Sequence, residues 1–554
     1  MPASSASVAD WPPTGPHGVA VCTGGDLWET SDTTINQKDT TMNQTNLHIA
    51  LIALTALAVC SDAAQPEPVA VHDTSLNPFI VPRGGLESFG DPFPTFWDGV
   101  WHHYTLRAGL GQIYHLTSTD LVKWSEHQPA MVGHSIATGT VLRHDGKYYL
   151  FFTQESSQTI RLVVSDNPWR FDYNKNRIVA KADNKVYLYK AGWQHFRDPY
   201  VFFNEAERRW WMLLEANNGN RVTVGLFTSR DLLSWEQHDP IFTDDSPGQW
   251  GTWRATELSW EEGDPNFKAA WRELLLQGSC PQVFEHEGRW YLTLLDEGIR
   301  VYEADSLHGP WERAGYYESM YFTASSRHAS DGKRRLCWGF FTRRNTPERN
   351  IKAKYGGPMG VGRELVFNAA GRLGVRPLPE LVAAIREPAH NAALFDCARP
   401  LRGTWEIDAE KREFRCTGED GGALLLDLPG ENPDYYFEAE IVLASPESSA
   451  DLLVRTTESF DRGYRVIADA GAGAVAIRQA KTGGGTFYKR DHPVADGKPV
   501  KVQIFVCDSI LEAFLDDHLS LSTRVLDRSA HRAAIEITGG RATIRNPLLH
   551  RFKE

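Results

Sequence analysis

Short segments dense in aromatic and aliphatic residues recur along the first two thirds of the chain, and each follows a tight polar turn. Asp-Gly and similar pairs supply the positive φ that a tight hairpin needs, and the aromatic residues after them favour a pleated strand. The pattern therefore predicts five β-hairpin units. The turns lie at Asp98-Gly99, Asp145-Gly146, Glu207-Arg208, Glu287-Gly288 and Asp331-Gly332.

A second motif, Ser-x-Asp-Leu-x-x-Trp, follows two of these units, at Ser118–Trp124 and Ser229–Trp235, and residues 301–311 are a looser version. It is typical of a strand, a polar turn and an outer strand that carries the Trp. Five hairpins, each with an outer pair of strands, are what a five-bladed β-propeller requires. A β-sandwich with coincidental repeats is the alternative. Residues 243–275 interrupt the repeat and are expected to be a loop insertion between the third and fourth units.

The pattern of apolar and polar residues changes after about residue 385. Residues 386–402 read as a connector, and residues 403–554 alternate apolar and polar positions between Gly-rich turns, which indicates an antiparallel β-sandwich. The predicted fold is all-β, with a five-bladed β-propeller over residues 65–385 and a C-terminal β-sandwich over residues 403–554.

The N-terminal region has two parts. Residues 1–41 are polar without an apolar period, which is typical of disorder or of a misassigned upstream extension. Residues 42–64 contain an apolar run too short for a transmembrane helix and then small residues, as a signal peptide does. Leu57–Cys60 resembles a lipoprotein signal, so Cys60 is either a lipid-anchor site or removed. We therefore expect export, to the periplasm, the cell surface or the medium.

Composition narrows the class of partner. The formal net charge of −13, without a Lys/Arg-rich stripe, argues against nucleic-acid binding. The seven cysteines form no CxxC pair, so neither a zinc site nor a disulfide scaffold is expected, and no metal or cofactor is predicted. Most of the 18 Trp residues should fill the core, with a few stacking on sugar rings; Trp97 is expected to bind substrate. The oligomeric state is not indicated.

Each hairpin is preceded by a lead-in that should form the innermost strand of its blade and line the central channel. The first residues of the five lead-ins should therefore meet in one funnel. Two of the lead-ins begin with Asp-Pro, and two converging acids suit glycoside cleavage. The alternative is that Asp-Pro merely begins a strand. The residues expected at the funnel mouth are Asp91, Thr138, Asp198, Ser279 and Tyr321.

These motifs are similar to those of glycoside hydrolase family 32. The segments that carry the resemblance are Gly90–Pro94, Arg197–Pro199, Ser279–Pro281, Gly362–Leu365 and Val506–Arg524. The resemblance implies that Asp91 is the nucleophile and that Asp198 stabilises the transition state through the sugar hydroxyls, with Arg197 beside it. Thr138, Ser279, Trp97 and Tyr321 are expected to contact substrate. Ser279 stands where the family has its acid/base glutamate.

A serine hydroxyl cannot donate a proton near neutral pH, and loss of a general acid typically costs about 10²–10⁴-fold in rate. Glu257 is the first candidate for a substitute acid, followed by Asp296 and Glu297. The predicted function is retaining hydrolysis of β-fructofuranosides of the sucrose, levan or inulin type, or of related furanosides. The alternatives are a weak or inactive carbohydrate-binding protein and an arabinan- or galactan-type glycosidase. The expected partner is an oligo- or polysaccharide.

Overall fold

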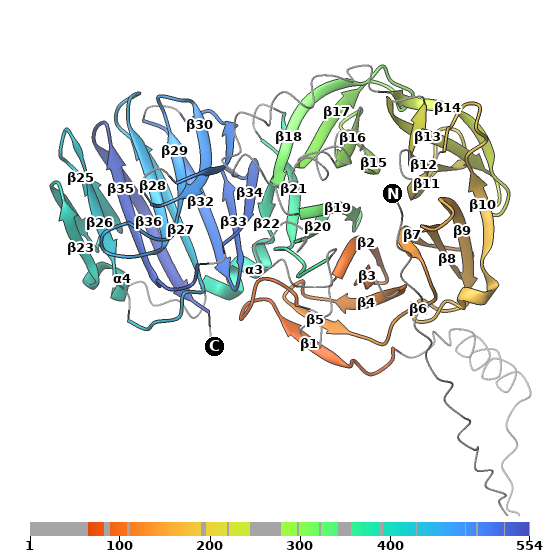
Figure 1. Cartoon of the computed structure of the whole chain (residues 1–554), viewed down its shortest axis with the longest axis horizontal. Helices are drawn as coiled ribbons and strands as arrows, with labels where there is room; N and C mark the ends of the chain where they lie inside the picture. The colour runs from red at the N-terminus through yellow and green to blue at the C-terminus, as the bar shows by residue number, and fades with distance from the viewer. Residues whose placement is uncertain are drawn as a thin grey trace, which may run out of the picture. The chain divides into compact units, whose positions relative to one another are not determined.

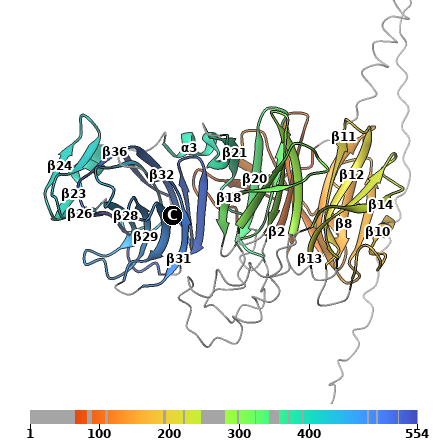
Figure 2. The same cartoon turned by 90° about the horizontal axis from the view of Figure 1, so that it is seen from above.

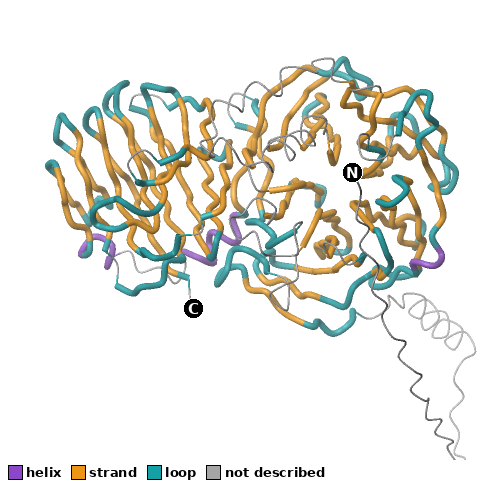
Figure 3. Tube along the Cα trace, in the orientation of Figure 1, coloured by secondary structure: helices purple, strands orange, loops and turns teal. Residues whose placement is uncertain are grey.

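The protein is represented by a computed structural model and consists mainly of β-strands in the part of the chain that the structure describes (Figure 3). The described ranges are 65–81, 89–107, 111–189, 195–218, 221–243, 279–295, 298–320, 323–341, 356–368, 371–386, 392–427, 429–481, 484–494, 497–525 and 527–552. Ala63–Glu554 form one compact unit that holds all of the sheets below. Within these ranges, helices are too short or too polar to span a lipid bilayer.

The first half of the described chain forms antiparallel sheets in sequence order (Figure 1). The first sheet contains β1 (Ala70–Asp73), β2 (Phe89–Trp97), β3 (Val100–Arg107), β4 (Gln112–Ser118), β5 (Lys123–Glu126) and β6 (Met131–Val132). The second contains β7 (Ile136–His144), β8 (Lys147–Gln154), β9 (Thr159–Ser165) and β10 (Arg177–Lys181), with the 3-10 helix η1 (Tyr173–Lys175) before β10. The third contains β11 (Arg197–Asn204), β12 (Arg209–Asn218), β13 (Arg221–Ser229) and β14 (Glu236–Thr243).

Two further groups follow the same up-and-down order. One contains β15 (Ser279–His286), β16 (Arg289–Leu295), β17 (Gly298–Ala304) and β18 (Glu312–Met320). The other contains β19 (Thr323–Ser330), β20 (Arg335–Phe341), β21 (Arg363–Phe367) and β22 (Leu373–Pro377). The aromatic segments predicted to be strands are β3, β8, β12, β16 and β20. The turn before β3 has positive φ at Asp98 (54°) and Gly99 (78°), as the Asp-Gly pattern requires.

The first strands of these groups lie next to one another around a common centre (Figure 1). Contacts run from β2 to β7, to β11, to β15, to β19 and back to β2, which closes a ring. Side chains between neighbouring sheets form separate apolar clusters; Phe151 and Met212, for example, belong to a cluster between the second and third sheets. The described fold is therefore all-β and propeller-like.

The rest of the chain begins with two short helices, α3 (Pro379–Arg386) and α4 (Ala392–Asp396). One seven-stranded sheet contains β23 (Ala398–Arg402), β26 (Gly421–Leu426), β28 (Ser449–Thr456), β29 (Tyr464–Asp469), β30 (Ala474–Gln479), β31 (Thr486–Asp491) and β35 (Arg532–Thr538). The facing strands are β24 (Trp405–Asp408), β25 (Glu413–Cys416), β27 (Tyr435–Leu443), β32 (Pro499–Cys507), β33 (Ile510–Leu515), β34 (Leu519–Arg524) and β36 (Ala542–Arg551). β23 covers residues expected to be connector, because its backbone pairs with β26.

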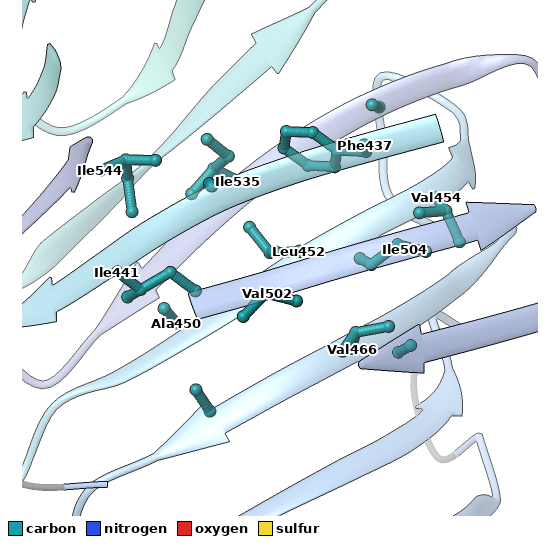
Figure 4. Packing of buried hydrophobic residues seen from close by; sticks show 14 of the residues in the cluster. Phe437, Ile441, Ala450, Leu452, Val454, Val466, Val502, Ile504, Ile535 and Ile544 are labelled. Atoms are coloured by element: carbon teal, nitrogen blue, oxygen red, sulfur yellow. The ribbon is translucent and has the colours of Figure 1, made fainter. Parts of the chain in front are cut away.

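Alternate residues of these strands meet in one apolar core, shown in Figure 4. Phe437 and Ile441 of β27 and Ile504 of β32 belong to the same cluster as Leu452 of β28 and Ile535 of β35. The predicted apolar–polar alternation is clear in β27, where alternate residues from Tyr435 to Leu443 belong to this core.

The two halves of the described chain are joined through backbone, apolar and ionic contacts. β18 pairs in parallel with β34, so the fourth group and the C-terminal strands share one sheet (Figures 1 and 2). Arg363 of β21 is fully buried between two carboxylates: Nη1 donates to Glu318, and Nη2 donates to Glu512 of β33 at 2.7 Å. The Glu512 carboxylate also accepts the N–H of Val361 at 2.7 Å. The junction therefore contains a desolvated charge network.

Replacement of Arg363 by Met should destabilise the protein by roughly 3–5 kcal/mol, because two buried carboxylates lose their shared cation. The measurement is the midpoint of equilibrium denaturation at neutral pH. Arg399→Met is the matched control, since Arg399 pairs with Glu458 at the surface, where both side chains are about half exposed. That control should cost less than about 1 kcal/mol. Equal midpoints for the two variants would contradict the structural role of the network.

Candidate functional site

The inner strands share one irregularity near their starts. The pairing register shifts between Phe89 and Pro92 in β2, and between Arg197 and Tyr200 in β11. Equivalent shifts lie between residues 136 and 139 of β7, 279 and 282 of β15, and 324 and 326 of β19. A β-bulge breaks the ladder and re-aims the side chains within it. All five inner strands therefore lose regular backbone pairing near their starts, which is where the candidate residues lie.

Three of these bulges bring two acids and a thiol together. Carboxylate oxygens of Asp91 and Asp198 and the Sγ of Cys280 all lie within 4.8 Å of one another, and all three residues are buried. Asp198 and Cys280 have positive φ, 61° and 55°, which is unusual for residues with a side chain. Backbone strain of this kind concentrates at functional sites, where the surrounding structure holds it in place.

Hydrogen bonds fix both carboxylates. The hydroxyl of Thr138 donates to Oδ2 of Asp91. The N–H of Cys280 donates to Oδ2 of Asp198 at 3.2 Å, and its thiol approaches the same oxygen at 3.4 Å. The N–H of Asp198 donates to Oγ1 of Thr153 at 2.9 Å. Carboxylate and thiol groups are donors that divalent cations also take, and no metal is assigned to this group.

Ser279 opens β15 beside this cluster and contacts a carboxylate that the sequence interpretation missed. Its Oγ donates to Oε2 of Glu215 at 2.9 Å, and Arg197 Nε donates to the same oxygen at 2.7 Å. Nη2 of Arg197 reaches Oγ of Ser279 at 3.4 Å, and its Nε lies 3.8 Å from Oδ2 of Asp198. Arg197 therefore connects position 279, Glu215 and Asp198.

Glu215 is buried, with 1% of its surface exposed, and pairs across the ladder with Arg197. Burial on its own would raise the pKa of this carboxyl. The charges of Arg197 and His195 and their hydrogen bonds outweigh that effect and lower the pKa to about 2. Glu215 is therefore an anion near neutral pH. The sequence signal for it is an acid directly after the apolar segment Trp210–Leu214.

The second oxygen of Glu215 binds a histidine just upstream of β11. Nδ1 of His195 lies 2.8 Å from Oε1 of Glu215, and about a quarter of the imidazole is exposed. The His195 N–H donates to Oδ1 of Asn217 at 2.6 Å, and the next N–H, of Phe196, donates to Oε1 of Gln158 at 3.0 Å. The backbone and the ring of His195 are therefore both held in place.

Arg327 of β19 supports the site from within the ring. It is buried, and its Nη1 donates to the carbonyl of Gly139 at 2.9 Å and to that of Pro199 at 3.2 Å. Its Nη2 donates to the carbonyl of Asp198 at 2.9 Å. Gly139 allows the close approach of β7 and β8, because a Cβ there would lie 2.1 Å from the carbonyl oxygen of Phe151.

The structure thus brings together Asp91, Thr138, Asp198, Arg197 and Ser279. Trp97 lies at the other end of β2 from Asp91, where its ring packs on His102 and Tyr148. Six residues of extended strand span about 20 Å, so Trp97 does not belong to this cluster. The remaining candidates lie outside the described residues: Glu257, Asp296, Glu297 and Tyr321.

Comparison with known proteins agrees with this arrangement. Residues 88–377 match the model of the glycosyl hydrolases family 32 N-terminal domain. A levanase from Bacillus subtilis is 23% identical over 493 residues, covering 85% of this chain and 68% of the levanase. A sucrose-6-phosphate hydrolase from the same organism is 27% identical over 285 residues, covering 47% of this chain and half of that enzyme.

Among solved structures, the Bombyx mori family 32 β-fructofuranosidase is similar in fold, with a TM-score of 0.57 at 15% identity. The alignment covers 92% of this chain and 99% of that protein. The matching domain spans just over half of the chain and contains the bulged inner strands and their acids. The chain therefore belongs to glycosyl hydrolase family 32, whose members are glycosidases that hydrolyse O-glycosyl bonds.

Proposed function

We propose that this protein is a retaining glycosidase that acts on β-fructofuranosides of the sucrose, levan or inulin type. The observation that carries the proposal is the buried group of Asp91 and Asp198, with Cys280, at the bulged starts of three inner strands of a family 32 domain. The similarity to a levanase and to a sucrose-6-phosphate hydrolase supports this substrate class.

The finer architecture is part of the same proposal. Five antiparallel groups whose first strands close a ring support a five-bladed β-propeller over residues 65–385. The two facing sheets with one apolar core support a β-sandwich over residues 403–554, after a connector at 386–402 in which β23 already begins. Residues 1–41 and the proposed signal peptide at 42–64 lie outside the described residues, and export is proposed from their sequence alone.

In the proposed first step, a carboxylate oxygen of Asp91 attacks the anomeric carbon, and the bond to the leaving oxygen breaks with its electron pair on that oxygen. Asp198 accepts hydrogen bonds from the sugar hydroxyls, and the Arg197 guanidinium stays beside it. In the second step, a water oxygen attacks the same carbon, loses a proton and displaces Asp91. The configuration is retained because each step inverts it.

A carbohydrate-binding protein without catalysis is the second candidate, and Ser279 is the observation that favours it. Its hydroxyl hydrogen-bonds to Glu215 and Arg197 and offers no titratable acid. A release assay separates the candidates, with sucrose, inulin, levan, arabinan and aryl furanosides as substrates. Hydrolysis of a fructofuranoside supports the proposal. Release from arabinan alone would assign an arabinan-type glycosidase, and binding without release would assign the binding protein.

Asp91→Asn should reduce kcat on the best fructofuranoside by at least about 10³-fold, because the isosteric amide cannot act as the nucleophile. Asp91→Ala should do the same. The assay is initial-rate hydrolysis at saturating substrate. Asp98→Asn is the control, since Asp98 lies in the exposed turn at the other end of β2 and pairs with Arg143. Wild-type activity in Asp91→Asn would refute the assigned nucleophile.

Ser279→Ala should reduce kcat/KM by roughly ten-fold or less, well below the 10²–10⁴-fold effect of losing a general acid. The hydroxyl links Glu215 and Arg197, but these two residues also contact each other directly, with Nε of Arg197 2.7 Å from Oε2 of Glu215. The measurement is kcat/KM on the same substrate across the pH range of activity. A loss beyond about 10²-fold, confined to substrates with poor leaving groups, would instead show that Ser279 takes part in proton transfer.

A further inference from the structure

The site contains a histidine–glutamate pair at the place where the family's acid is missing. Glu215 reaches Ser279 with one carboxylate oxygen and His195 with the other. The oxygen atom of a serine side chain occupies the position of a glutamate Cγ, so a glutamate carboxyl at position 279 would end two bonds further on. Glu215 Oε2 lies 2.9 Å from Oγ of Ser279, a comparable reach. A carboxylate is therefore present near position 279, supplied by a different strand.

Glu215 cannot supply the proton itself. Its pKa is lowered to about 2, so the carboxyl is ionised near neutral pH. Both of its oxygens also accept hydrogen bonds. An ionised carboxylate can only accept, so Nδ1 of His195 carries a hydrogen toward it. The proton that can be transferred is then the one on Nε2.

The surroundings of His195 suit that role. Glu215 from β12 is the acid that faces the ring. Arg197 begins β11 two residues after His195, and Glu155 lies 4.0 Å from its guanidinium. About a quarter of the imidazole is exposed, and the ring contacts Glu215 through Nδ1, which leaves Nε2 as the nitrogen on the other side of the ring. A carboxylate bound to one nitrogen of an imidazole fixes the orientation of the ring and leaves the other nitrogen to exchange a proton.

We propose that His195, oriented by Glu215, is the general acid and base of this enzyme in place of the glutamate that Ser279 replaces. The proposal rests on the fructofuranosidase function above. In the first step, Nε2 of the imidazolium gives its proton to the leaving glycosidic oxygen as Asp91 bonds to the anomeric carbon. In the second step, the neutral imidazole takes a proton from the water that attacks that carbon and displaces Asp91.

The test compares His195→Gln with wild type on two substrates. One is the sucrose or fructan that wild type hydrolyses fastest, and the other is 4-nitrophenyl β-fructofuranoside, whose leaving group needs little protonation. kcat/KM should fall about 10²–10⁴-fold on the first substrate and less than ten-fold on the second.

Two further readouts separate chemistry from folding. Sodium azide should raise the turnover of His195→Gln on the aryl substrate and yield fructosyl azide, since azide attacks the covalent intermediate without a general base. Glu215→Gln should weaken hydrolysis of the natural substrate in the same selective way, because the imidazolium loses its counter-ion. His308→Gln is the matched control: His308 is exposed, and its Nε2 lies 2.9 Å from Glu207 at the opposite end of the β11–β12 hairpin.

The outcomes distinguish the two proposals. If wild type cleaves neither class of β-fructofuranoside, the proposed function fails, and the assignment of His195 fails with it. If wild type is active and His195→Gln behaves as His308→Gln does, only the assignment of His195 is wrong. An equal loss on both substrates also overturns it, because a proton donor acts only where the leaving group needs a proton. A selective loss in Glu257→Gln and not in His195→Gln would transfer the role to Glu257.

Discussion

The guanidinium of Arg327 holds together the ring of inner strands on which the site depends. Bulges at the strand starts remove carbonyls from regular ladder pairing, and a buried carbonyl without a donor costs free energy comparable to a lost hydrogen bond. Arg327 supplies donors to the carbonyls of Gly139, Asp198 and Pro199, on two neighbouring strands. Threonine hydroxyls add two more donors: Thr105 donates to the carbonyl of Gly90, and Thr140 donates to the carbonyl of Pro199, which therefore accepts two hydrogen bonds.

This arrangement explains how the site can retain strained backbone. Asp198 and Cys280 hold positive φ, a conformation that costs of order 1–3 kcal/mol at a residue with a side chain. The carbonyl of Asp198 is held by Arg327, its N–H is held by Thr153, and its carboxylate accepts the N–H of Cys280. Since three separate strands fix one residue, the acid is positioned before any substrate arrives, as precise chemistry requires.

The sequence alone predicted the hairpins, the inner strands and the positions of Asp91 and Asp198 near the strand starts, because turn chemistry and repeats are local. It did not predict Glu215 or His195. Their proximity to Ser279 depends on which residues pair across β11 and β12, and the bulge between Arg197 and Tyr200 changes that register. Trp97 stays a predicted substrate contact, although six residues of β2 separate it from Asp91.

The same network gives a physical reason for serine at position 279. Glu215 is a buried anion, already matched by Arg197 and His195. A glutamate at 279 would bring a second carboxylate against it in a desolvated site, and one of the two would have to take up a proton, since like charges at hydrogen-bond distance cannot both ionise there. Serine instead donates its hydroxyl to Glu215 at 2.9 Å. Serine at 279 is therefore compatible with the buried anion at 215, whereas a second carboxylate there would compete with Glu215 for the charge of Arg197.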